Sequence, residues 1–104
     1  MILKRLLSKL PDLIGTSGFL DVKLSGIEYD SGRIRPGELF VAIPGMNVDG
    51  NKYIDEAIAR GASAIIGEKK IDLGPIPYVR VKDSRIALAR VSTLFYDMPA
   101  RKID

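Results

Sequence analysis

Two short apolar runs separated by a helical segment constrain the fold of this chain more than any other feature. Residues 39–43 are apolar at every position, and residues 62–67 form a second run of mostly small and aliphatic side chains. Residues 52–61, between the two runs, place apolar side chains at helical spacing. Because a helix with short links joins the runs, we predict adjacent parallel strands connected by a right-handed crossover.

The ends of this helix and of the first run can also be predicted. Asn51 is a suitable N-cap, because its side chain can accept a hydrogen bond from the first helical turn. Gly61 suits the C′ position, where the backbone takes a positive φ that glycine adopts without strain. Pro36 and Gly37, which precede the first run, fit the central positions of a type II turn.

The preceding and following segments complete a small α/β domain with a mixed sheet and helices packed on it. Residues 2–10 have helical spacing, whereas the stretch around Gly18 is typical of a turn. Residues 22–29 and 78–81 predict two further strands, and Gly26 interrupts the first of them.

A final helix is predicted after the last strand. Asp83 or Ser84 is its expected cap, and Pro99 is its expected end. The side chains expected to pack inward from it are Leu88, Val91 and Phe95.

The composition limits the chemistry that this chain can carry alone. Its 104 residues suffice for one hydrophobic core but not for two. The chain contains no cysteine and no histidine, which excludes most zinc sites, thiol nucleophiles and imidazole bases. The net charge of +3 is spread among interspersed acidic residues, so we expect no nucleic-acid partner. No apolar run approaches the roughly 18 residues of a membrane span, and we expect a cytoplasmic protein.

Two polar loops are predicted to face each other at neighbouring strand ends. The sequence PGMNVDGN, residues 44–51, leaves a buried strand and opens a helix, and DSGR, residues 30–33, follows another strand. Ligands of α/β sheets bind at such ends, and N–H groups at a helix N-terminus suit a phosphate. From spacing alone, ordinary turns and caps are the more frequent explanation of such loops. The chain contains neither a Walker-type phosphate loop nor a G-x-G-x-x-G motif.

Two longer stretches match a known family pattern. They are GIEYDSGRIRPGELFVAIPGMNVDGNKYIDEAIARGASAII and YVRVKDSRIALARVSTLFYDMP. Together they resemble the N-terminal domain of the Mur ligases, most closely that of the ligases adding the third peptide residue to the peptidoglycan precursor. The family's D-S-R arginine position is Gly32 here, and Arg33 stands one place later. The matching positions are Asp30, Ser31, Pro36, Gly37, Glu38, Leu39, Phe40, Val41, Ala42, Gly45, Asp49, Gly50, Ala57, Gly61 and Ala62.

The resemblance implies that residues 1–104 form one domain that binds the UDP group of UDP-MurNAc-L-Ala-D-Glu. In such ligases a central domain uses ATP and Mg²⁺ to activate the peptide carboxylate, and a C-terminal domain brings the amino acid. Both are expected outside this chain, which should therefore bind without ligating and contain no catalytic residue, metal site or cofactor. The residues implied to contact UDP are Tyr29 and Ser31 near the uridine and Met46, Asn47 and Val48 near the diphosphate, with Arg33 and Asp49 as secondary candidates.

Three other functions remain open from the sequence. The chain could be the N-terminal domain of the ligase that adds D-Ala-D-Ala, which shares much of the pattern. It could also be a stand-alone nucleotide-binding or regulatory module without ligase activity, or a small basic nucleic-acid-binding domain. Under the ligase interpretation, its partners are the UDP-MurNAc-dipeptide and the rest of the ligase chain.

Overall fold

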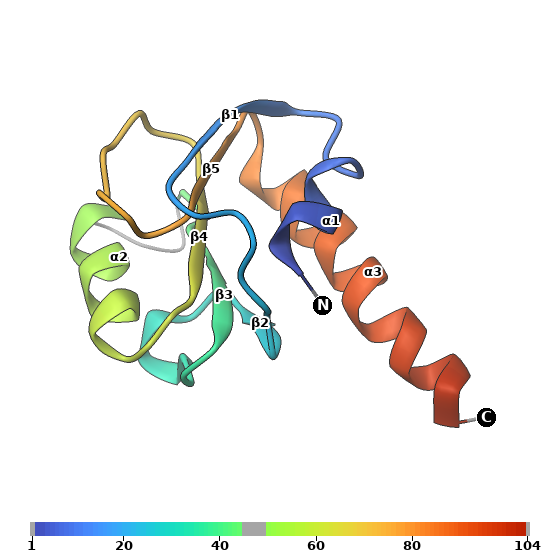
Figure 1. The fold of residues 1–104 in the computed structure, drawn as a ribbon. Coiled ribbons are helices and arrows are strands. Elements are labelled where there is room, and N and C mark those ends of the chain that lie inside the picture. Colours follow the sequence, from blue (N-terminus) through green and yellow to red (C-terminus); the bar gives the residue numbers. More distant parts are fainter. Residues whose placement is uncertain (1, 45–49, 104) are drawn as a thin grey trace.

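The computed structural model describes residues 2–44 and 50–103 and contains one five-stranded sheet in the order β1-β5-β4-β3-β2 (Figure 1). Strands β2, β3, β4 and β5 are parallel, and β1 pairs antiparallel with β5. The sheet is therefore mixed, as predicted. In chain order the elements are α1 (Leu3–Leu7), β1 (Leu13–Ser17), β2 (Gly26–Glu28), the 3-10 helix η1 (Ser31–Arg33), β3 (Glu38–Val41), α2 (Gly50–Ala59), β4 (Ala64–Gly67), β5 (Tyr78–Val81) and α3 (Ser84–Ile103).

Helices cover both faces of the sheet. Figure 1 shows α2 on one side of the strands and α1 and α3 on the other. Leu39 and Val41 of β3 pack in the core on the side of α1 and α3, whereas Phe40 between them packs with Ile54 of α2. Because successive strand residues point to opposite faces, a strand covered on both sides is apolar at every position, which explains the run at residues 39–43.

The end of α2 matches its prediction and the start does not. Gly61 has a φ of +101° and donates its N–H to the Ile58 carbonyl at 3.0 Å, while Ala62 donates to Ala57 at 3.0 Å. This pair of bonds is the Schellman ending of a helix. The helix begins at Gly50, so the prediction that Asn51 is its N-cap is wrong.

Strand β1 is not predicted from the sequence, which indicates only the turn around Gly18. The strand pairs with β5 alone, and four of its five side chains are exposed. An edge strand that buries almost none of its side chains lacks the alternation by which strands are recognised. The turn itself is present, because Gly18 has a φ of +79°.

Helix α3 begins as predicted and continues further than predicted. The Asp83 carboxylate accepts hydrogen bonds from the N–H groups of Arg85 at 2.9 Å and Ile86 at 3.3 Å, which makes Asp83 the cap. Helical backbone continues through Pro99 to Ile103, so the expectation that Pro99 ends the helix is wrong. A proline removes one backbone donor, and the residues beyond it keep their own bonds. The inward packing of Leu88, Val91 and Phe95 is confirmed.

Candidate functional site

The two predicted polar loops begin at the same edge of the sheet. Strands β2 and β3 are parallel neighbours, with Glu28 opposite Phe40, so their carboxyl ends lie side by side. The DSGR loop leaves β2 at this edge, and the chain leaving β3 leads from it into α2. The candidates Met46, Asn47, Val48 and Asp49 fall in the second loop and lie outside the described residues.

The backbone of the first loop is hydrogen-bonded within the loop. One Glu28 carboxylate oxygen accepts from the N–H groups of Tyr29 and Asp30, each at 3.1 Å. The Asp30 side chain accepts from Gly32 N–H at 2.9 Å, and its carbonyl accepts from Arg33 N–H at 2.9 Å. These four N–H groups are therefore used within the loop and are not free to bind a ligand. The groups that the loop exposes to solvent are side chains.

Ser31 is buried and bonded to α2. Its side chain is 2% exposed, and its hydroxyl donates to a Glu56 carboxylate oxygen at 2.5 Å. A hydroxyl has one donor and two acceptor lone pairs. Because the donor is used on Glu56, the Ser31 hydroxyl has only its acceptor lone pairs left for a ligand.

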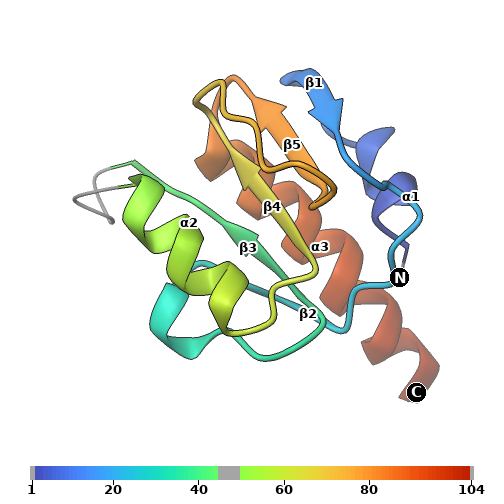
Figure 2. The same cartoon turned by 60° about the vertical axis from the view of Figure 1, so that its left-hand side comes forward.

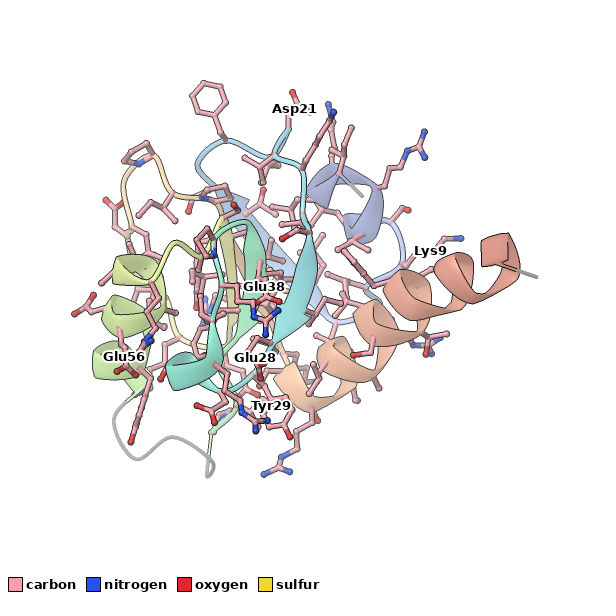
Figure 3. The ribbon with its side chains drawn as sticks, turned by 90° about the horizontal axis from the view of Figure 1, so that it is seen from below. Lys9, Asp21, Glu28, Tyr29, Glu38 and Glu56 are labelled. Atoms are coloured by element: carbon pink, nitrogen blue, oxygen red, sulfur yellow. The ribbon has the colours of Figure 1, made fainter. Side chains whose placement is uncertain are left out.

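Glu56 is a residue of this region that the sequence does not reveal. It lies on α2, beside η1, and is 43% exposed with Arg60 at 4.0 Å from its second oxygen (Figure 3). It holds η1 against α2 through Ser31. Nothing in the spacing of residues 31 and 56 signals this contact, because it depends on how α2 packs.

Tyr29 and Arg33 are the accessible side chains of the first loop. Tyr29 stands directly after β2 and is 43% exposed. Figure 3 shows it near Glu28. Arg33 is exposed on η1, and its guanidinium has no hydrogen-bond or ion-pair partner among residues 2–44 and 50–103. An aromatic ring and an unpaired cation thus stand within four residues of each other at the strand end.

The β5 end contributes a second residue that the sequence does not single out. The Arg85 guanidinium donates to the Pro44 carbonyl at 3.3 Å. Pro44 follows β3, so this bond joins the first turn of α3 to the chain that leaves β3. The sequence DSR at residues 83–85 resembles DSGR at residues 30–33, and this similarity is the one signal that could have suggested a shared location.

Within the described part of the chain, no three histidine, cysteine, aspartate or glutamate side chains are grouped so that they could hold a metal ion. Among the helices of those residues, none has the length and apolarity needed to cross a membrane.

Comparisons with known proteins agree on one family. The sequence model of the Mur ligase family, catalytic domain, matches residues 23–96. The UDP-N-acetylmuramoyl-L-alanyl-D-glutamate–2,6-diaminopimelate ligase of Clostridioides difficile is 38% identical over 93 residues, 89% of this chain. Its counterpart from Fusobacterium nucleatum is 44% identical over 85 residues, 81% of this chain. The chain spans only 19% and 18% of these two relatives.

Solved structures of a related ligase have a similar fold. The MurF ligase of Thermotoga maritima, in complex with ADP, matches 68% of this chain with a TM-score of 0.55 and 34% identity. The UDP-N-acetylmuramoylalanyl-D-glutamyl-2,6-diaminopimelate–D-alanyl-D-alanyl ligase of Acinetobacter baumannii matches 67% with a TM-score of 0.56 and 28% identity. In both, the matched part is 16% of the solved chain.

Proposed function

Because this chain belongs to the Mur ligase family, we propose that it is the domain of such a ligase that holds the UDP group of a UDP-MurNAc-peptide. The similarity to diaminopimelate-adding ligases supports UDP-MurNAc-L-Ala-D-Glu as the precursor and addition of the third peptide residue as the reaction. The observation that carries the proposal is the meeting of the β2 and β3 carboxyl ends at one sheet edge. Such an edge is where open α/β sheets bind nucleotides.

The side chains at this edge suit the parts of a uridine diphosphate. The exposed ring of Tyr29 can stack on a flat base, and the guanidinium of Arg33, which has no partner in the described part of the chain, can bind a phosphate. Ser31, restricted to accepting, fits a donor such as the N3–H of uracil. Helix α2 starts at the same edge, and the N-terminus of its ten residues favours an anion. Met46, Asn47, Val48 and Asp49 remain predicted contacts from the family resemblance.

The domain acts on the reaction by positioning. Under this proposal the ATP and Mg²⁺ that activate the peptide carboxylate belong to another part of the ligase. Anchoring the remote UDP group holds the carboxylate in register for that step, which can remove several kcal/mol, about 7–11 at most, of the entropic barrier. The chain itself supplies binding and contributes no group to the bond-forming step.

A nuclear magnetic resonance titration of this chain with UDP tests the proposal. We expect amide shifts at Tyr29, Ser31 and residues 46–48, and weaker binding of ADP, which has the same diphosphate and a different base. Tyr29→Ala should weaken UDP binding about tenfold, because stacking on a base contributes roughly 1–3 kcal/mol. Phe19→Ala, at an exposed aromatic residue beyond the opposite end of the sheet, should not change it. No shifts at these amides at millimolar UDP would contradict the proposal.

The D-Ala-D-Ala-adding reaction is a second candidate, because the Acinetobacter baumannii enzyme with a similar fold is named a D-alanyl-D-alanyl ligase. The two candidates share the UDP group and differ in the peptide that the precursor carries. Phosphate release by the complete ligase separates them. Phosphate release from ATP with UDP-MurNAc-dipeptide and diaminopimelate or lysine would support the first candidate. Release with UDP-MurNAc-tripeptide and D-Ala-D-Ala would support the second.

A further inference from the structure

A cavity of about 320 Å³ lies on the sheet, away from the β2 and β3 ends. It is formed by β1, β5 and the segment after β4, and β1 is the edge strand farthest from β2. Figure 2 shows α2 over β3 and β4 and not over β1. No residue of the proposed UDP site lines this cavity.

One part of the cavity wall is apolar. Ile14 of β1 and Ile71 line it together with Tyr78. Ile14 is 53% exposed, so a flat apolar ligand would remove its side chain from water. The Tyr78 hydroxyl donates to the Lys69 carbonyl, and burial raises the pKa of Tyr78 to about 12. The phenol is therefore neutral at pH 7 and adds no negative charge to the cavity.

The charged side chains that line the cavity are both cations, Lys70 and Arg80. Arg80 donates its Nε–H to the Glu68 carbonyl at 2.9 Å, which fixes the direction of its side chain. Its Nη groups and the Lys70 ammonium have no hydrogen-bond or ion-pair partner in the part of the chain that the structure describes. The Glu68 carboxylate accepts from Ser84 N–H at 2.8 Å and Ser84 hydroxyl at 2.9 Å through one oxygen, and among the described residues it forms no ion pair with Lys70 or Arg80.

We propose that this cavity binds a small organic anion, with its phosphate, sulfonate or carboxylate group on Lys70 and Arg80 and a flat apolar body against Ile14, Ile71 and Tyr78. Two cations that converge without a carboxylate select an anion, and a guanidinium can hold it with two hydrogen bonds. Ser17 of β1 lies opposite Tyr78 in the strand pairing, so its hydroxyl can add a neutral donor on this face of the sheet. The volume is near the lower limit of small-molecule pockets, about 300 Å³, so the ligand has one or two ring systems.

A pair of fluorescent probes tests this proposal on the chain as it stands. One is 8-anilinonaphthalene-1-sulfonate, and the other is N-phenyl-1-naphthylamine, which has the same rings without the sulfonate. We expect the sulfonate to bind at least tenfold more tightly and to shift the amides of Thr16, Ser17 and Ile71. UDP should not displace it, because the two sites are separate.

Variants of two neighbouring lysines test which positive charge the sulfonate needs. Lys70→Gln should weaken binding of the sulfonate about threefold or more, whereas Lys69→Gln, next to it and not in the cavity wall, should not. Arg80→Gln should weaken it about tenfold, with thermal unfolding as the check that this half-buried position still folds. Equal affinity for both probes, equal effects of the two lysine variants, or amide shifts at Tyr29 and Ser31 would each overturn the proposal.

Discussion

An Asp-Ser pair follows both β2 and β5, and the fold uses the two pairs differently. In each pair the aspartate accepts from a backbone N–H two residues later, at 2.9 Å, and the serine is buried with its hydroxyl on a glutamate. After β5 the pair opens the 20-residue helix α3. After β2 it opens a single 3-10 turn, and the chain then returns through Gly37 to the start of β3.

The difference lies in how far each glutamate is removed from water. Glu68 receives both the N–H and the hydroxyl of Ser84, which is fully buried. Within the described part of the chain, Glu56 accepts one hydrogen bond, from the Ser31 hydroxyl, faces Arg60 at 4.0 Å and is 43% exposed. The β5 corner is therefore closed to water, whereas at the β2 corner Tyr29 is exposed. Both serines are thus buried, and the two corners differ in the exposure of the glutamate that each serine contacts.

The largest effect is expected at the closed corner. Glu68→Ala leaves two buried donors of Ser84 without their acceptor, so the free energy of unfolding should fall by about 2–4 kcal/mol. Urea denaturation measures this loss. Glu68→Gln keeps an acceptor oxygen in place, so its loss of unfolding free energy should be less than half of that of Glu68→Ala. A loss below about 1 kcal/mol for Glu68→Ala would show that the two corners are equally open.

The closed side also predicts a loss of stability in alkali. The folded pKa of Tyr78 is about 12, raised by burial above the ordinary value of 10, with Arg80 opposing and Glu68 adding to the rise. As the pH rises, the unfolded chain loses the Tyr78 phenol proton before the folded chain does. The contribution of the protonated phenol to the free energy of unfolding is therefore intact below pH 10 and is lost as the pH rises to 12. Unfolding at pH 9 to 12 measures the slope. Tyr78→Phe, which has no proton to lose, should flatten it, and an unchanged slope would contradict the assignment.

The smallest effect is expected at the open corner. Ser31→Ala removes one hydrogen bond from Glu56, which water can replace, so the loss should be about 0.5–1.5 kcal/mol. Thermal unfolding of this variant beside Ser84→Ala compares the two serines directly. Ser84→Ala should be the more destabilising of the two. The reverse order would contradict the distinction between a closed and an open corner.

The sequence alone determines the central part of this protein. The apolar runs and the helix between them predict the parallel pairing of β3 with β4, and Gly61 and Asp83 mark helix ends correctly. These features depend on residues within a few positions of one another, where periodicity and capping chemistry act. The sequence also identifies the family, because the matching positions run through most of the chain.

Tertiary structure decided the rest. The edge strand β1, the Ser31 bond to Glu56 and the Arg85 bond to Pro44 join segments far apart in the chain. A hydroxyl at residue 31 forms the same turn whichever acceptor lies nearby, so its local sequence contains no information about its partner. Whether it donates to a ligand or to a glutamate 25 residues later is set by the packing of α2 against η1. Local pattern determines which elements form, and only their packing determines which polar groups remain free at the site.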